Sequence, residues 1–205
     1  RAAWRANMRG EVGAPGEVIK ADFVVVGGGM AGTAEAVAAA EAGMNVAIVQ
    51  DRPKLGGNAS DEIRVKTEAK RREYHWIVDA IKNTPANGNS MAADDAKRMN
   101  FVKSYKNISI NTGWRAYGVV TNAARKIVAV DARNVETGAR RRFVAPLYCD
   151  ATGDGWLGYW AGAAYMLGRE AKDEYDEPKR APKVSDRSTM GNSLLWTTKT
   201  QTNDY

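Results

Sequence analysis

An α/β fold with a parallel sheet is predicted by three features of the sequence. Residues 23–26 form a continuous apolar run, as in a strand buried on both faces. A turn follows with Gly27, Gly29 and Gly32 at the spacing of a dinucleotide-binding fingerprint, and it opens into an alanine-rich helix. A second apolar run spans residues 46–49. Strand, glycine turn, helix and strand in this order predict a nucleotide-binding βαβ unit.

The glycines of the turn have different expected roles. Gly27 allows a tight turn, Gly29 lets the backbone approach a pyrophosphate, and Gly32 lets the helix pack closely on the strand. The helix is expected at residues 30–41, and its free N–H groups and positive dipole end favour phosphate. The residues expected at the phosphate are Gly27, Gly28, Gly29, Met30, Ala31 and Gly32.

The end of the second strand is expected to reach a ribose. Gln50 stands there, eighteen positions after Gly32, where an acid is usual. A neutral amide still hydrogen-bonds a diol. Asp51 either joins this contact or caps the following turn, and Arg52 either lies against adenine or phosphate or is a solvated loop residue.

The remaining elements extend the sheet. Helices are expected at residues 74–81 and 91–105, and the second leads into a third parallel strand at 108–110. Three strand-like runs at hairpin spacing predict a β-meander over 114–121, 127–134 and 140–145. A final buried strand then ends in the turn Ala151-Thr152-Gly153.

Two motifs indicate which dinucleotide is bound. DRPKLGGNAS at residues 51–60 resembles the Arg-x-x-x-Gly-Gly extension of flavoproteins of the glutathione-reductase type, and LYCDATGDG at 147–155 resembles their second flavin motif. With the meander between them, the order of parts is that of an FAD-binding domain. The resemblance implies a Rossmann-like parallel sheet with helices on both faces and an inserted three-stranded β-meander.

A closer resemblance covers about residues 20–197. The strings VQDRPKLGGNASDEIRV and DATGDGWLGYWAGAAYMLGREAKDEYDEP, with the later TMGNS, are similar to a bacterial family of FAD-dependent oxidoreductases that often accompany polysaccharide-degrading enzymes. This resemblance implies tight FAD binding and redox chemistry on a small or sugar-like substrate. No histidine lies in the Gly-Gly loop, so the FAD is expected to be non-covalent.

Further site residues follow from these motifs. Ser60 is expected either to offer its hydroxyl to the cofactor or to satisfy local backbone, and Ala116 or its neighbours to meet the adenine edge. Asp150 is expected to brace the Ala-Thr-Gly turn. The expected cofactor-binding residues beyond the first turn are Gln50, Asp51, Arg52, Gly56, Gly57, Asn58, Ser60, Ala116, Thr152, Gly153 and Asp154.

Few side chains are candidates for chemistry on a substrate. Glu62 and Arg64 are two apart on an expected extended segment and would share a face, although a surface ion pair is the competing interpretation. His75 is the only histidine and is expected to be structural rather than a proton shuttle. The single Cys149, an expected core residue, excludes an internal disulfide, and no metal site is expected.

Composition and charge limit the kinds of partner that the chain is expected to bind. The 30 basic and 24 acidic residues give a formal charge of +6, with clusters at residues 70–72 and 140–142. We interpret these clusters as solvated faces rather than a nucleic-acid site. No stretch of twenty apolar residues is present, so no membrane span is expected.

The expected organisation has three parts: an extended leader at residues 1–20, an FAD-binding domain at 21–165, and the start of a truncated second region at 166–205. The chain begins without methionine and is expected to be a fragment. The first functional hypothesis is an oxidoreductase that transfers hydride from a small polar substrate, such as a carbohydrate, to FAD. The alternatives are an NAD(P)-binding dehydrogenase or reductase domain and a truncated non-catalytic nucleotide-binding domain. Compartment and oligomeric state stay open.

Overall fold

A computed structural model describes residues 15–67, 75–84, 91–175 and 181–189. Contacts divide the chain into two compact units, Arg1–Gly162 and Ala163–Tyr205. The strands of the first unit are β1 (Glu17–Lys20), β2 (Phe23–Val26), β3 (Val46–Gln50), β4 (Ile108–Thr112), β5 (Trp114–Thr121), β6 (Ile127–Asn134), β7 (Arg140–Val144) and β8 (Leu147–Asp150). Its helices are α2 (Met30–Glu41), the short 3-10 helix η1 (Gly57–Ala59), α3 (His75–Ile81), α4 (Ala92–Lys103) and α5 (Trp156–Ala161).

Four strands form a parallel sheet in the order β4-β3-β2-β8. Strand β2 is central and runs through the core with alternate side chains on opposite faces. Val25 packs into the cluster on one face, and Val24 and Val26 pack into the cluster on the other. Both faces of β2 are therefore buried, which explains its unbroken apolar run.

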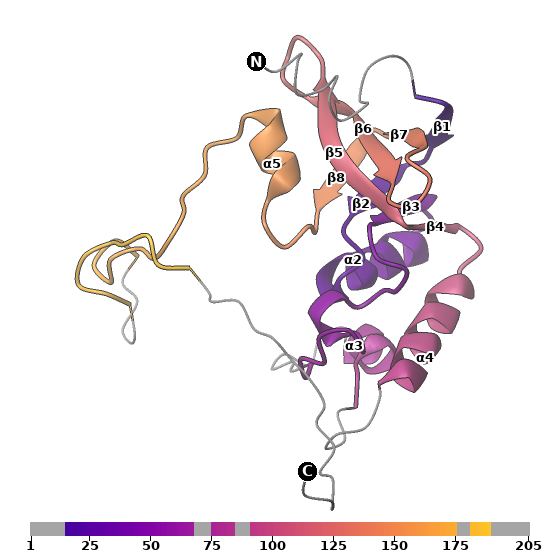
Figure 1. Cartoon of the computed structure of the whole chain (residues 1–205), viewed down its shortest axis with the longest axis horizontal. Helices are drawn as coiled ribbons and strands as arrows, with labels where there is room; N and C mark the ends of the chain where they lie inside the picture. Colours follow the sequence, from indigo (N-terminus) through magenta and orange to yellow (C-terminus); the bar gives the residue numbers. More distant parts are fainter. Residues whose placement is uncertain (1–14, 68–74, 85–90, 176–180, 190–205) are drawn as a thin grey trace, which may run out of the picture. The chain divides into compact units, whose positions relative to one another are not determined.

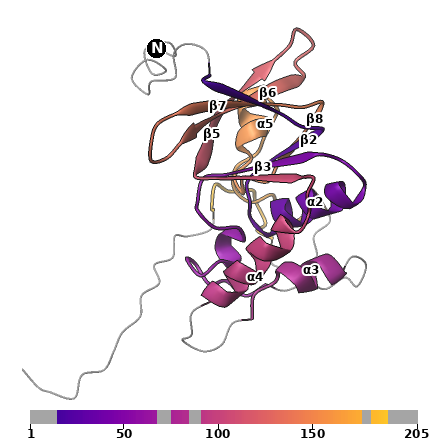
Figure 2. The same cartoon turned by 90° about the vertical axis from the view of Figure 1, so that its right-hand side faces the viewer.

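Helices α2, α3 and α4 cover one face of this sheet (Figures 1 and 2). Their core includes Val37, Ile81 and Val102, packed against Ile48 of the sheet. Helix α2 ends in a Schellman motif, in which the N–H of Gly43 donates to Ala40 O and that of Met44 donates to Ala39 O. The positive φ of Gly43, 86°, permits this turn.

The other face is covered mainly by a second sheet, in the order β1-β7-β6-β5 (Figure 2). Strands β5, β6 and β7 are the antiparallel meander that the sequence predicts. Phe143 and Val130 of this sheet, and Leu157 of α5, share a core with the parallel sheet. The sequence predicts helices on both faces, and among the described residues the six-residue α5 is the helix that packs on this face beside the meander.

The segment expected to be an extended leader contains a strand. Residues Glu17–Lys20 form β1, which pairs in parallel with β7. The pairing is reinforced by Arg141, whose Nε donates to Glu17 Oε2 at 2.7 Å. This contact joins residues far apart in sequence, so local sequence pattern did not reveal it.

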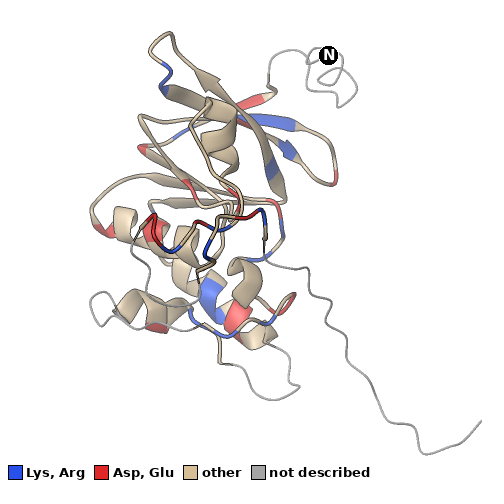
Figure 3. Cartoon of the chain, turned by 90° about the vertical axis from the view of Figure 1, so that its left-hand side faces the viewer, with Lys and Arg blue, Asp and Glu red and all other residues tan. Residues whose placement is uncertain are grey.

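The basic cluster at residues 140–142 lies on β7, among the strands of the second sheet (Figure 3). Arg142 makes a bidentate contact with Asp131 at 2.7 and 2.8 Å, and Arg141 pairs with Glu17. Carboxylates therefore compensate Arg141 and Arg142. The cluster at residues 70–72 falls outside the described residues.

The second unit contains one described bridge, between Arg169 and Asp186. Their main chains exchange two hydrogen bonds of 3.0 Å, and the two side chains form an ion pair. The Arg169 guanidinium is the main reason that the pKa of Asp186 lies below its usual value. Over the part of the chain that the structure describes, helices are too short or too polar to cross a membrane.

Candidate cofactor-binding site

A groove of about 590 Å³ opens at the carboxyl ends of β2, β3 and β8. Ligands of open parallel sheets bind at this edge because the turns after the strands converge there. The expected residues that line it are Gly27, Gly29, Met30, Ala31, Gln50, Asp51, Arg52, Gly56, Gly57, Asn58, Ala116, Thr152, Gly153 and Asp154. Segments distant in sequence thus assemble into one site.

The N-terminus of α2 faces this groove without a side-chain cap. Its N-cap residue is Gly29, and its first turn carries no acidic residue. The first intrahelical bond runs from the N–H of Thr33 to Gly29 O at 2.9 Å, so the N–H groups before it lack helical acceptors. This positive helix end is suited to an anionic phosphate.

The fingerprint glycines are required for different reasons. Gly27 has a φ of 104°, and a Cβ there would lie 2.1 Å from Ala151 O. A Cβ on Gly32 would lie 2.0 Å from Gly27 O. Both glycines are therefore needed by the fold itself. At Gly29, by contrast, a Cβ would meet no atom within 4 Å.

The Gly56-Gly57 turn lies directly against the first glycine turn. The N–H of Gly56 donates to Gly28 O at 2.7 Å, and a Cβ on Gly57 would lie 3.0 Å from Gly29 Cα. Gly56 is in the left-handed region with a φ of 110°. Two glycine-rich turns therefore present backbone to the same part of the groove.

Gln50 lines the groove, and both ends of its carboxamide hydrogen-bond to the protein main chain. Its Oε1 accepts from the N–H of Gly28 at 2.7 Å, and its Nε2 donates to Lys54 O at 3.1 Å. The side chain is 5% exposed. These two contacts make Gln50 a bridge between the two turns, and the expected ribose contact stays a prediction. Asp51 is the exposed carboxylate next to it.

The turn after β8 is organised by Asp150. Its Oδ1 accepts from the N–H and the hydroxyl of Thr152, at 3.2 and 2.7 Å, and its Oδ2 accepts from the N–H of Gly158. The expected bracing role of Asp150 is confirmed. The same contacts fix the start of α5, which brings Trp156 and Trp160 to the groove as a stacked pair with ring centroids 5.7 Å apart.

Family comparison decides the class of protein. A sequence model described as FAD dependent oxidoreductase matches residues 22–204. The chain belongs to this family of FAD-dependent oxidoreductases. FAD is therefore its cofactor, and the uncapped helix end, the open space at Gly29 and the two glycine turns fit a dinucleotide.

Individual relatives match smaller parts. The chain is 39% identical over 62 residues to a soluble pyridine nucleotide transhydrogenase of Azotobacter vinelandii, which covers 30% of this chain and 13% of that protein. The chain thus spans a small part of the curated relatives that it matches.

Two solved structures share the fold of this chain. A geranylgeranyl bacteriochlorophyll reductase-like protein of Thermoplasma acidophilum aligns with a TM-score of 0.55 and 17% identity, over 75% of this chain and 45% of that one. THI4 of Thermovibrio ammonificans aligns with a TM-score of 0.54 and 15% identity, over 90% of this chain and 80% of that one. At such identities the likeness concerns the fold alone.

Some expected site residues of this FAD-dependent oxidoreductase lie outside the groove lining. Gly28 gives its N–H to Gln50, and Gly32 packs under the turn. Ser60 is 1% exposed, and its hydroxyl donates to Gly57 O at 2.7 Å. The structure thus gives Ser60 the local backbone role rather than a place on the groove.

The expectation for Glu62 and Arg64 is wrong in its premise. The segment is a turn rather than an extended strand, because Ser60 O accepts the N–H groups of Ile63 and Arg64. Arg64 has a φ of 64° and contacts Asp61, while Glu62 pairs with Arg52 at 3.4 Å. Neither residue lines the groove. The two side chains therefore do not share the face of an extended strand.

The sequence reasoning missed several lining residues. These are Val26, Val49, Ala59, Val65, Lys66, Thr67, Trp114, Ala151, Trp156 and Trp160. Arg115 is a neighbour of Ala116 and so belongs to the expected adenine-edge position, and Trp114 stands one residue before it. Trp156 and Trp160 are four residues apart, a helical spacing that places both on one face after the Thr-Gly-Asp-Gly motif.

The thiol of Cys149 lies away from the groove. Cys149 is partly buried on β8, and its Sγ donates to Glu35 Oε2 at 2.7 Å. Burial, followed by Glu35, raises the pKa of the thiol to about 12. His75 begins α3, and its side chain falls outside what the structure describes. Among the described residues, no group of three or more His, Cys, Asp or Glu could hold a metal.

Proposed function

We propose that this chain is the FAD-binding portion of a flavin-dependent oxidoreductase, with FAD lying along the groove. Its pyrophosphate would rest at the N-terminus of α2 and the Gly56-Gly57 turn. The adenosine end would lie toward Asp51 and Ala116, and the flavin toward Thr152, Gly153 and Asp154. Each of these residues lines the groove.

The observation that carries this proposal is the open space at Gly29. Its φ of −67° and ψ of −175° suit any residue, so the backbone does not demand glycine. A Cβ there would meet no protein atom within 4 Å. Gly29 lines the groove next to the uncapped end of α2, so a side chain would occupy the space that a phosphate needs.

The chemistry would come mainly from the cofactor. Bound flavin accepts a hydride, whereas the protein supplies orientation, nearby charge and exclusion of water. The described lining contains no histidine, cysteine or tyrosine, which supports a non-covalent cofactor. Backbone amides and small residues would therefore account for most of the binding.

A small polar molecule is the proposed substrate, with a carbohydrate as the first candidate. That choice follows from the resemblance to oxidoreductases that accompany polysaccharide-degrading enzymes. A pyridine nucleotide is the second candidate electron donor, because one similar protein is named as a pyridine nucleotide transhydrogenase.

Anaerobic reduction of the bound flavin tests this proposal. Purified chain is loaded with FAD and mixed separately with a panel of sugars and with NADH or NADPH, and flavin absorption is followed. The proposal predicts bleaching by a sugar. Bleaching by pyridine nucleotides alone would favour the second candidate. FAD binding without bleaching by either would favour a non-catalytic nucleotide-binding domain.

The same sample tests the form of attachment. Acid precipitation is expected to release all the flavin into the supernatant, because binding is proposed to be non-covalent. Flavin that stays with the precipitated protein would contradict this part of the proposal.

A further inference from the structure

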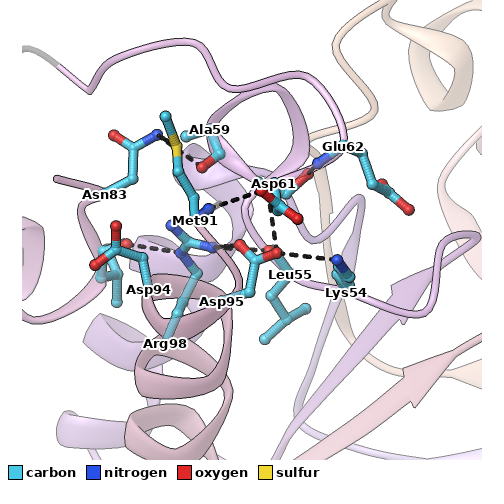
Figure 4. Close-up of polar contacts among 12 residues, drawn as sticks. Lys54, Leu55, Ala59, Asp61, Glu62, Asn83, Met91, Asp94, Asp95 and Arg98 are labelled. Carbon is cyan, nitrogen blue, oxygen red and sulfur yellow. Dashed lines mark hydrogen bonds and ion pairs between the residues drawn. The ribbon is translucent and has the colours of Figure 1, made fainter. Parts of the chain in front are cut away.

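The most deeply buried charge in the described protein is the guanidinium of Arg98, on α4 (Figure 4). The side chain is 0% exposed. Its Nε donates to Ile81 O at 2.6 Å, and its Nη1 donates to Leu55 O at 3.0 Å and to Asp95 Oδ1 at 2.9 Å. One side chain thus joins α4 to the end of α3 and to the start of the Gly-Gly turn.

Arg98 lies directly behind that turn. A Cβ on Gly56 would come within 2.4 Å of Arg98 Nη1, so the guanidinium packs on the Gly56 backbone. The other side of Gly56 faces the groove, which Arg98 does not line. Gly56 in turn donates its N–H to Gly28 O at 2.7 Å. A chain of direct contacts therefore runs from Arg98 through Gly56 to the first glycine turn.

Neutralising the charge of Asp95 does not by itself explain why the guanidinium of Arg98 is buried. Asp95 Oδ2 also accepts from the N–H of Asp61 at 3.0 Å and lies 3.4 Å from Lys54 Nζ. A buried ion pair is weak evidence for stability because desolvation offsets much of the attraction. Arg98 Nη2 has no hydrogen-bond partner within the described residues, which adds to the cost of burying it.

The hydrogen bonds from Arg98 to two carbonyl oxygens indicate the role of this buried side chain. Leu55 O and Ile81 O belong to separate segments, and a planar guanidinium can donate to both in a fixed geometry. Gly56, the residue after Leu55, adopts the left-handed conformation with a φ of 110°. Fixing Leu55 O therefore fixes the direction in which the turn leaves Leu55.

We propose that Arg98 is a positioning residue for FAD, which holds the Gly56-Gly57 turn against Gly29 without touching the cofactor. This inference rests on the proposed placement of FAD in the groove. It predicts that loss of the guanidinium weakens FAD binding more than it disturbs the rest of the fold.

Arg98→Met removes the donors and keeps an unbranched apolar chain, while Lys54 and the Asp61 amide still hold Asp95. Val102→Ala is the matched control, since Val102 is also 0% exposed on α4 but belongs to the helix core rather than to the turn. Three quantities are measured: the FAD dissociation constant by flavin fluorescence, the thermal midpoint of each apoprotein, and amide hydrogen exchange over residues 55–60.

Arg98→Met is expected to weaken FAD binding by about tenfold to a hundredfold, the equivalent of one lost hydrogen bond from a charged donor. Exchange at residues 55–60 should become faster in this variant. Val102→Ala should lower the thermal midpoint and leave both the FAD affinity and the exchange of the turn unchanged. Arg98→Lys, whose single ammonium cannot match the guanidinium geometry, should fall between wild type and Arg98→Met.

Wild-type FAD affinity in Arg98→Met would overturn the inference while leaving the proposed function intact. Equal losses of affinity in Arg98→Met and Val102→Ala would also overturn it, since the effect would then be general destabilisation. If Arg98→Met does not fold, Arg98→Lys decides, and wild-type affinity in it overturns the inference. A wild-type chain that binds no FAD would contradict the proposed function and this inference together.

Discussion

The carboxamide of Gln50 bridges the N–H of Gly28 and the carbonyl of Lys54. One partner needs an acceptor and the other needs a donor, and a carboxamide provides both. A carboxylate could accept from Gly28 but could not donate to Lys54. The amide at a position where an acid is usual therefore has a structural explanation, and the sequence alone did not show it because both partners lie in turns.

Cys149 gives a prediction at the scale of one residue. Burial and the neighbouring Glu35 raise the pKa of its thiol to about 12, so the reactive thiolate is scarce in the folded protein. We expect iodoacetamide to modify native protein slowly at about pH 8, and urea-unfolded protein much faster, because an ordinary thiol ionises near that pH. Mass spectrometry of the labelled protein measures both rates.

The sign of the pH dependence follows from the raised pKa. The folded state holds the thiol proton more tightly, so this stabilising contribution is present below the unfolded pKa of about 8.5 and is lost as pH rises toward 12. Cys149→Ala is expected to remove that part of the alkaline loss of stability. Equal labelling rates in native and unfolded protein would contradict the account.

At the scale of elements, local patterns predicted most of the fold. The apolar run of β2, the glycine turn and the alanine-rich α2 each have a signature within a few residues, and the three meander strands lie close to their predicted bounds. Strand β1 and the turn after Ser60 were missed. Strand β1 depends on pairing with distant β7, and the turn is held by main-chain bonds to Ser60 O.

Helix α5 provides a prediction at this scale. It has six residues, too few for a stable isolated helix, and its one buried side chain is Leu157 at 2% exposure. Leu157→Ala is expected to reduce the free energy of unfolding by about 2–5 kcal/mol. Urea unfolding followed by circular dichroism measures the change.

Leu147→Ala is the matched control for that experiment. Leu147 is 49% exposed at the start of β8, so its truncation should cost less than about 0.5 kcal/mol. Similar losses in both variants would show that Leu157 does not anchor α5.

At the scale of the whole molecule, the site depends on contact between two distant motifs. Ala151 of the second motif lies against Gly27 and Gly32 of the first, at distances that exclude any larger residue in either glycine position. Strand β8 brings them together by pairing with β2. The sequence predicted each motif separately, but which lining residues meet in space, Trp156 and Trp160 among them, follows only from this pairing.

If FAD lies in the groove beside Gly29, titration of wild type and Gly29→Val with FAD will separate the two proteins. Wild type is expected to bind FAD near-stoichiometrically. Gly29→Val is expected to show no detectable FAD binding, with the apoprotein thermal midpoint little changed, because the added Cβ would meet no atom within 4 Å beyond its chain neighbours. Stoichiometric FAD binding by a folded Gly29→Val variant would contradict the account, because the phosphate would then have to lie elsewhere.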